Sequence, residues 1–397
     1  MHLLKTSIFE QSSDILITCA PDLSEITGGE IKALSIPIKK IVPHGIIVEG
    51  TAQTAMYLCM HLRTANKVLF LLKEAKADNP DDLYRIAKKI NWENLFSNST
   101  YFSIDSFVQN STIRDTRFAN VKCKDAIADY FVEKTGKRPD SGPLRDQVVI
   151  FIYWRESDLS IYLDLSGEPI SRHGYRINPW KAPMAEPLAA GVVIATDWNP
   201  ETPFINPMCG SGTLAIEAAM IGINKIPGLI RNEYAFQHIH GYDEAMWHTI
   251  KKMALQNVKN TLPFKIIASD HDQRALDAAK LNAEKAGVDH LIDFVLCDFQ
   301  DTPIEEGQPG VVLLNPEYGE RLGNEESLEL TYKEIGDFFK QKCSGYKGAV
   351  FTGNLELAKC IGLKPKRKIK FFNAKIECRL MQYELYLGTR RTSFKEE

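Results

Sequence analysis

The first 170 residues alternate between strand-like and helix-like patterns. Apolar runs bounded by turn residues predict strands, and apolar residues spaced three and four apart predict helices. The predicted strands are 14–19, 40–43, 45–50, 67–72, 101–108, 147–154 and 159–165, and the predicted helices are 22–34, 51–62, 81–90 and 120–135. This part of the chain is therefore expected to consist of small α/β units.

A proline-rich connector leads into a second alternation of strands and helices. Three prolines between 178 and 187 favour an extended start, and an alanine-rich helix is predicted over 188–194, with a domain boundary near 175. The strands that follow are predicted at 204–205, 264–269, 292–297, 311–314 and 349–353, and the helices at 213–221, 242–255, 273–286 and 328–342. This order predicts an α/β fold with a parallel, doubly wound sheet, closed by an antiparallel strand over 375–387.

The strand at 204–205 runs directly into a glycine turn. Asn206 and Pro207 end the strand, Gly210 and Gly212 form the turn, and a helix of small and apolar residues follows. Glycines let backbone N–H groups approach a ligand, Thr213 is placed to cap the helix, and a helix N-terminus leaves N–H groups unpaired. A lone Gly-x-Gly is as often only a tight turn, but the whole stretch favours a cradle for a nucleotide-like ligand.

Polar residues stand at the ends of the next strands. Asp270 ends the second strand, where a carboxylate can accept two ribose hydroxyls. It lies about 60 residues beyond the glycine turn, not the roughly 20 of a dinucleotide site, which disfavours NAD and predicts an insertion over 224–265 with an extra helix. Asp298 follows the third strand, where it can accept from the exocyclic amine of adenine, and Asn315 follows the fourth.

Composition and charge limit the range of functions. The 397 residues carry a formal charge of −3, with 44% apolar and 25% charged residues, so nucleic-acid contact must come from local patches or shape. The eight cysteines are scattered, with no zinc-type spacing, which is typical of reduced thiols in a cytoplasmic protein. No apolar run has the length of a membrane span, so we expect no membrane partner, and we expect no metal.

The fourth strand ends in a stretch that resembles a known methyltransferase motif. Asn315-Pro316-Glu317-Tyr318 is similar to the Asn-Pro-Pro-Tyr motif of methyltransferases that act on exocyclic amines of bases, and 319–322 (Gly-Glu-Arg-Leu) is typical of guanine-N2 RNA methyltransferases. With the stretch 206–213, this makes the chain resemble the THUMP-bearing guanine-N2 methyltransferases of large-subunit ribosomal RNA. The resemblance implies a Rossmann-like class I methyltransferase domain that uses S-adenosylmethionine.

The same resemblance implies roles for individual residues. Because the lone pair of a base amine is delocalised into the ring, the Asn315 side chain and the Pro316 carbonyl would accept its hydrogens, and Tyr318 would stack on the base. The implied cofactor-binding residues are Asn206, Pro207, Cys209, Gly210, Gly212, Thr213, Asp270 and Asp298.

The first half of the chain resembles a THUMP domain preceded by a small ferredoxin-like piece. The similarity rests on 62–68, 121–131, 163–167 and 172–176, and it implies binding to ribosomal RNA. The predicted domains are a ferredoxin-like piece over 1–50, a THUMP domain over 51–170 and a methyltransferase domain over 171–397. The basic residues of this region would form a solvated surface without the resemblance; with it, some of them would contact RNA phosphates: Arg63, Lys67, Arg114, Arg117, Lys122, Lys124 and Arg138.

Two residues depart from the family pattern. Asn206 stands where the family often has Asp, so it adds no charge for the methionine ammonium, and Glu317 replaces the second proline of the motif. We expect the Glu317 side chain to point away from the base. Adenine-N6 methylation and a non-catalytic RNA-binding role remain open at this point. The basic run 364–372 is compatible either with an RNA contact or with a solvated strand edge.

Overall fold

The chain forms two compact units, described separately below. In the computed structural model, the described residues are 7–110, 113, 115–181, 183–305, 307–318 and 325–386. The N-terminal unit comprises Met1–His173 with Ile226–Gln256, and the C-terminal unit comprises Gly174–Lys225 with Asn257–Glu397. The domain limits given above stay a prediction. Residues 226–256 lie within the predicted insertion, and by their contacts they belong to the N-terminal unit.

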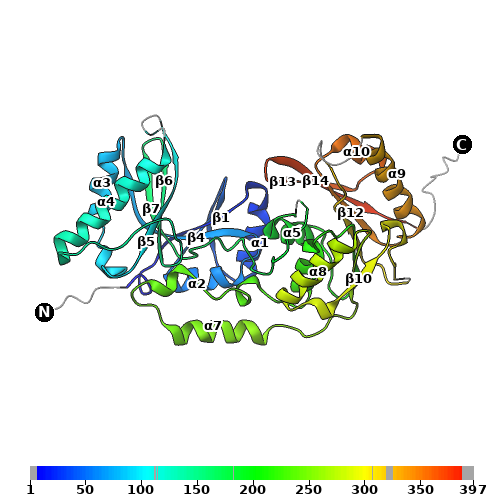
Figure 1. The fold of residues 1–397 in the computed structure, drawn as a ribbon, viewed down its shortest axis with the longest axis horizontal. Coiled ribbons are helices and arrows are strands. Elements are labelled where there is room, and N and C mark those ends of the chain that lie inside the picture. The colour runs from blue at the N-terminus through cyan, green and yellow to red at the C-terminus, as the bar shows by residue number, and fades with distance from the viewer. Residues whose placement is uncertain are drawn as a thin grey trace, which may run out of the picture. The chain divides into compact units, whose positions relative to one another are not determined.

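A single mixed sheet organises the N-terminal unit (Figure 1). Among the described residues, seven strands join it in the order β2-β3-β1-β4-β7-β6-β5. They are β1 (Ser13–Cys19), β2 (Ile38–Val42), β3 (Gly45–Gly50), β4 (Ala65–Lys76), β5 (Phe102–Gln109), β6 (Val148–Arg155) and β7 (Asp158–Asp164). Strands β5 and β6 are parallel, and the other neighbours are antiparallel.

The helices of this unit lie within one or two residues of their predicted bounds, except that the helix Thr116–Thr135 begins four residues before the predicted start at 120. They are α1 (Ser24–Ala33), α2 (Ala52–His61), α3 (Pro80–Lys88), α4 (Thr116–Thr135) and α7 (Glu244–Gln256). The Asn79 side chain caps α3, the Asp115 side chain caps α4, and Gly136 ends α4 with φ of 72°. Phe131 of α4 packs on Phe96, which packs on Phe102 of β5, so α4 covers one face of this part of the sheet.

Residues 226–256 complete the core of the N-terminal unit. Phe236 packs against Tyr234 and Trp247, with ring centroids 4.9 and 4.8 Å away. Gly228 lies so close to α2 that a Cβ there would meet the Met60 carbonyl oxygen at 2.4 Å. This segment is therefore integral to the N-terminal unit, although it is inserted between two elements of the C-terminal unit.

The C-terminal unit has the predicted doubly wound sheet. Its seven described strands follow the order β10-β9-β8-β11-β12-β14-β13. They are β8 (Phe204–Pro207), β9 (Ile266–Asp270), β10 (Ile292–Leu296), β11 (Val311–Leu314), β12 (Lys347–Thr352), β13 (Arg367–Asn373) and β14 (Ile376–Glu384). The strands from β10 to β12 are parallel, and β14 and β13 are antiparallel additions. The predicted fold class and closing strand are confirmed; Leu387 lies outside the described residues.

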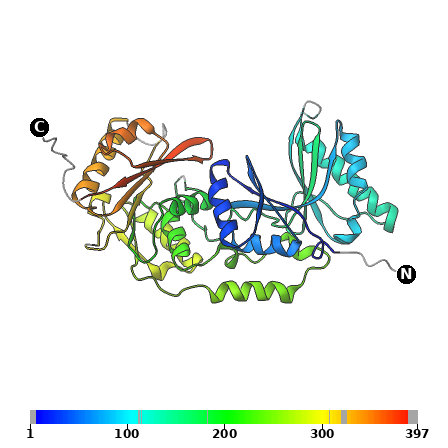
Figure 2. The same cartoon turned by 180° about the vertical axis from the view of Figure 1, so that it is seen from behind.

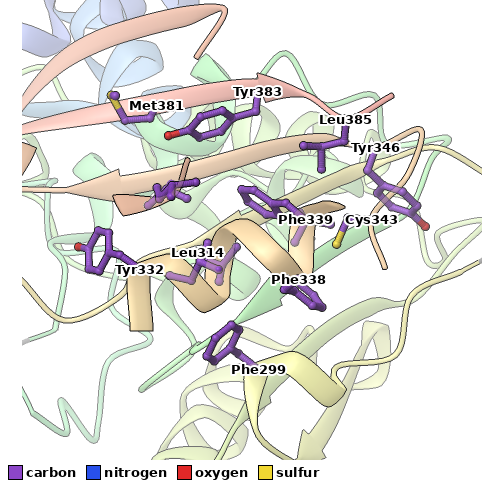
Figure 3. Close-up of a cluster of buried hydrophobic side chains, with 14 of the residues drawn as sticks. Phe299, Leu314, Tyr332, Phe338, Phe339, Cys343, Tyr346, Met381, Tyr383 and Leu385 are labelled. Atoms are coloured by element: carbon purple, nitrogen blue, oxygen red, sulfur yellow. The ribbon is translucent and has the colours of Figure 1, made fainter. Parts of the chain in front are cut away.

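Helices flank this sheet and bury a large apolar core (Figures 1 and 2). They are α5 (Glu186–Ala195), α6 (Thr213–Gly222), α8 (Gln273–Ala286), α9 (Glu325–Gln341) and α10 (Leu355–Cys360). Figure 3 shows Tyr332, Phe338 and Phe339 of α9 beside Leu314 of β11 and Tyr383 of β14. This core holds the end of β11, where the motif of interest begins. The basic run 364–372 lies largely in the edge strand β13. In the part of the chain that the structure describes, no helix is long and apolar enough to cross a membrane.

Candidate active site

Four neighbouring parallel strands bring the predicted site residues to one edge of the C-terminal sheet. Strand β8 lies between β9 and β11, and β10 lies beyond β9. Their carboxyl ends carry Asn206-Pro207, Asp270, Asp298 and Asn315. From β8 the strand order runs through β9 to β10 in one direction, and β11 and β12 continue it in the other direction. The carboxyl ends of β8 and β11 therefore form the topological switch point, where doubly wound sheets bind ligands.

Glycine is required at the two positions of the turn for different physical reasons. Gly210 has φ of 54°, and a Cβ there would meet nothing within 4 Å, so its backbone is open to a ligand. Gly212 has φ of 78°, and a Cβ there would lie 2.8 Å from the Cβ of Ala279 in α8. Gly212 is thus required by the close packing of α6 on α8, not by ligand approach.

Thr213 does not cap α6, so that prediction is wrong. Gly212 is the N-cap residue, and no side chain caps the helix. The Thr213 hydroxyl instead accepts a hydrogen bond from Arg176 Nη1 at 3.3 Å. Arg176 also donates to the Met184 carbonyl at 2.6 Å and to Glu186 at 3.2 Å. The N–H groups at the start of α6 are consequently without a capping side chain.

The two acidic residues differ in how they are held. Asp270 accepts from Gly210 N at 2.9 Å through one carboxylate oxygen and from Asp272 N at 3.0 Å through the other, which ties the glycine turn to the end of β9. Asp298 is exposed and accepts from Gln300 N at 3.1 Å. A carboxylate oxygen has two lone pairs, so both residues keep acceptor capacity for a ligand.

Asn206 and Cys209 lie behind the turn. Asn206 is fully buried, and its Nδ2 donates to the Leu313 carbonyl at 2.8 Å, which links β8 to β11 two residues before Asn315. Its Oδ1 is buried without a hydrogen-bond partner among the described residues. Burial, reinforced by the Asp270 carboxylate, raises the pKa of the Cys209 thiol well above its usual range, so Cys209 is a neutral thiol and not a nucleophile.

Asn315 presents a free acceptor at the end of β11. The Asn315 Oδ1 is buried and has no hydrogen-bond partner in the described part of the chain. Pro316 is buried, whereas Glu317 is exposed. The Tyr332 hydroxyl lies 3.4 Å from the Glu317 carbonyl oxygen and 2.7 Å from Thr352 Oγ1, so α9 and β12 brace the loop. A buried acceptor at this position can accept a hydrogen bond from a donor that a ligand supplies.

Tyr318 is held against the antiparallel end of the sheet. Its hydroxyl accepts from Asn373 Nδ2 at 3.0 Å, and its ring lies against Gly353, where a Cβ would meet it at 2.6 Å. Burial raises the pKa of the Tyr318 hydroxyl, which is therefore neutral. The remainder of the family-like stretch, 319–323, lies outside the described residues.

Sequence reasoning missed Asn282, a buried residue of α8 that organises the turn. Its Nδ2 donates to the carbonyls of Asn178 and Ser211 at 2.8 and 3.1 Å, and its Oδ1 accepts from the N–H groups of Ile177 and Asn178. It lies seven positions after Ala275 and three after Ala279, on the buried stripe of the helix. A polar residue on an apolar helix stripe was the available signal.

Among the described residues, no group of three or more His, Cys, Asp and Glu side chains is arranged to hold a metal ion. Oxygen acceptors and backbone N–H groups at the strand ends, together with a neutral thiol, suit a polar organic ligand.

Comparison with known proteins identifies the family. Residues 173–382 match the family described as RMKL-like, methyltransferase domain. The chain belongs to this methyltransferase family. Residues 77–164 match the THUMP domain, and residues 14–69 match the RlmL ferredoxin-like domain. The predicted resemblance to a THUMP-bearing methyltransferase is therefore confirmed.

Individual relatives support the same assignment. The chain is 36% identical over 375 residues to the ribosomal RNA large subunit methyltransferase K/L of Psychromonas ingrahamii. This match covers 93% of this chain and 50% of that protein. The chain is 32% identical over 380 residues to the Marinomonas protein of the same name, covering 94% of this chain and 53% of the relative. The chain thus spans about half the length of these curated relatives.

A solved structure described as a possible methylase, from Clostridium difficile, is 29% identical to this chain. It matches with a TM-score of 0.85 over 96% of this chain and 100% of that one. The whole order of ferredoxin-like, THUMP and methyltransferase domains is therefore shared with a known structure.

Proposed function

We propose that this RMKL-like methyltransferase transfers a methyl group from S-adenosylmethionine to the exocyclic N2 amine of a guanine in large-subunit ribosomal RNA. The observation that carries the proposal is the Oδ1 of Asn315 at the switch point of the sheet, which is buried and has no hydrogen-bond partner among the described residues. The names of the relatives support ribosomal RNA as the substrate. The choice of guanine N2 rests on the resemblance of the 315–322 stretch to guanine-N2 enzymes.

The residues of the site fit this methyl donor. The donor of class I methyltransferases is S-adenosylmethionine, which supplies an electrophilic methyl group on a sulfonium. Gly210 leaves open space beside its backbone, and Asp270 retains acceptor capacity for ribose hydroxyls. Asp298 is exposed at the neighbouring strand end, where it can accept from the adenine amine. Asn206 is fully buried, so its part is to hold β8 against β11 behind the turn.

Asn315 and Pro316 act on the target base. The Asn315 Oδ1 accepts one hydrogen of the base amine, and the Pro316 carbonyl oxygen accepts the other. Holding both hydrogens orients the nitrogen lone pair toward the incoming methyl group and stabilises the positive charge that develops on nitrogen. The bracing of the loop by Tyr332 keeps these acceptors in place during the reaction.

Tyr318 and Glu317 border the same site. We propose that the Tyr318 ring stacks on the base, with its hydroxyl anchored by Asn373. The exposed Glu317 side chain is proposed to point away from the base. A Glu317→Pro variant with much higher methyl transfer would contradict this placement, as would absence of donor binding by the parent protein.

The test is methyl transfer by the purified chain to undermodified large-subunit ribosomal RNA. Titration calorimetry first measures binding of S-adenosylmethionine, and nucleoside analysis by mass spectrometry then identifies the product. N2-methylguanosine supports the proposal. Methyladenosine would replace it with adenine-N6 methylation, and RNA binding without transfer would replace it with a non-catalytic role.

A further inference from the structure

One face of the sheet in the N-terminal unit carries aromatic side chains on the side opposite to α4. Strand register places Phe107 of β5 beside Tyr153 of β6, and Phe151 of β6 lies two residues away on the same face. Phe102 of β5 has the opposite parity and lies on the face that α4 covers. Figure 1 shows α3 and α4 on one side of β5, β6 and β7. The aromatic face, defined as Phe107, Phe151 and Tyr153, is thus turned away from them.

Two rings of this aromatic face stack on each other, one of them exposed and the other partly exposed. Phe107 is 42% exposed, and its ring is stacked on that of Tyr153 with centroids 5.2 Å apart and an interplanar angle of 14°. Sheets that bind single-stranded RNA use such rings to stack unpaired bases.

A buried cation lies over one ring of the aromatic face. Lys67 Nζ lies 5.3 Å from the centroid of the Phe151 ring and is bound by Asp164 at 2.7 Å and Asp105 at 3.0 Å. Burial alone would lower the pKa of Lys67, but the Asp164 and Asp105 carboxylates outweigh burial and raise it. The raised pKa favours the charged ammonium, which can attract the face of the Phe151 ring.

The basic residues predicted to contact phosphate are mostly engaged elsewhere. The described ones that form ion pairs are Lys67 with Asp164, Arg117 with Asp115, Lys122 with Asp81, and Lys124 and Arg138 with Asp125. Arg114 lies outside the described residues. Arg155, in contrast, is exposed, follows Tyr153 on the same face of β6, and has no ion pair in the described ranges.

We propose that the aromatic face is a stacking platform for unpaired bases of the RNA, with Arg155 contacting an adjacent phosphate. The inference rests on the proposed function, because it takes the bound RNA to be the substrate of methylation. Stacking is tolerant of sequence because every base has a π-face, so the platform selects single-stranded segments and not a particular sequence. It would hold the RNA by a region distinct from the methylation site.

The test measures binding of a fluorescent single-stranded RNA oligomer to the full chain by anisotropy, without any methyl transfer. Phe107→Ala and Tyr153→Ala should each weaken binding by about 5- to 150-fold, the range for loss of one stacked base, and Tyr153→Phe should retain it. The logarithm of the association constant falls linearly with the logarithm of the salt concentration. Arg155→Ala should make this slope shallower by about 1, whereas Phe107→Ala should leave it unchanged.

Phe118→Ala is the matched control, because Phe118 is 48% exposed on α4. Phe118→Ala should bind RNA as tightly as the parent does. All variants should bind S-adenosylmethionine as tightly as the parent does. Equal RNA binding by Phe107→Ala, Tyr153→Ala and the parent would overturn the platform, as would equal losses for duplex and single-stranded RNA. Failure of methyl transfer to guanine would overturn the proposed function and leave this binding result standing.

Discussion

At the scale of single residues, the candidate chemistry depends on one amide oxygen. The Asn315 Oδ1 is buried and unpartnered among the described residues, and the loop behind it is braced by Tyr332. A buried acceptor without a donor costs about 1–3 kcal/mol, so the fold bears a cost there that a bound base amine would recover. This cost is the physical reason to place the target nitrogen at Asn315.

Asn315→Ala is expected to lower the rate of methyl transfer by on the order of 100- to 1000-fold, as loss of one preorganised polar contact to a developing charge does. The affinity for S-adenosylmethionine should stay within about twofold, because Asp270 and the glycine turn are untouched. Initial rates with a radiolabelled donor and calorimetric titration measure the two quantities.

Gln382→Ala serves as the control for general damage, because Gln382 lies in β14 and donates to the Ala195 carbonyl. A normal rate for Asn315→Ala, or a parallel loss of donor affinity, would remove Asn315 from its proposed role.

At the scale of elements, the turn between β8 and α6 combines two requirements that look alike in sequence. Gly210 leaves space for a ligand, whereas Gly212 allows α6 to pack on α8 at Ala279. Asn282 of α8 then ties the same turn to the connector through the Ser211 and Asn178 carbonyls. The site is therefore held by helix packing behind it as well as by the strands.

Gly212→Ala is expected to destabilise the C-terminal unit by about 2 kcal/mol or more, because a Cβ adds left-handed strain and a clash with Ala279. Gly210→Ala adds only the strain, about 1–2 kcal/mol, but should weaken S-adenosylmethionine binding because its Cβ enters the open space. Urea denaturation and donor titration separate the two effects.

The double variant Gly212→Ala with Ala279→Gly removes the clash and should regain part of the lost stability. If it is no more stable than Gly212→Ala alone, the packing explanation for Gly212 is wrong.

At the scale of the whole molecule, the chain passes between its two units three times, after His173, Lys225 and Gln256. Residues 226–256 lie between α6 and β9 in sequence, but their aromatic side chains build the core of the N-terminal unit. The N-terminal unit is therefore incomplete without a segment encoded inside the methyltransferase part of the chain.

Trp247→Ala is expected to destabilise the N-terminal unit by about 3–5 kcal/mol, the usual cost of removing a buried tryptophan side chain. Hydrogen exchange followed by mass spectrometry should show lost protection in α2 and in residues 226–256. Protection in α8 and β11 should be unchanged.

Met253→Ala is the matched control on the same helix, because Met253 is 60% exposed and should leave exchange unchanged throughout. Loss of protection confined to the C-terminal unit in Trp247→Ala would show that the segment does not belong to the N-terminal core.

The sequence by itself determined the type and order of nearly all the elements. Helix α8 and strand β11 have the predicted bounds, because the spacing of apolar residues and the flanking cap signals are local properties. The sequence also determined the family, because the family motifs are defined by residue types and their order along the chain.

Only the tertiary structure decided which partner each side chain has. A capping role for Thr213 is locally reasonable, but Arg176 binds its hydroxyl instead. The packing partner of Gly212, the four hydrogen bonds of Asn282 and the place of residues 226–256 are likewise non-local. Local spacing determines which face of an element is apolar, whereas long-range packing determines what that face meets, and the functional surfaces of this protein follow from the second.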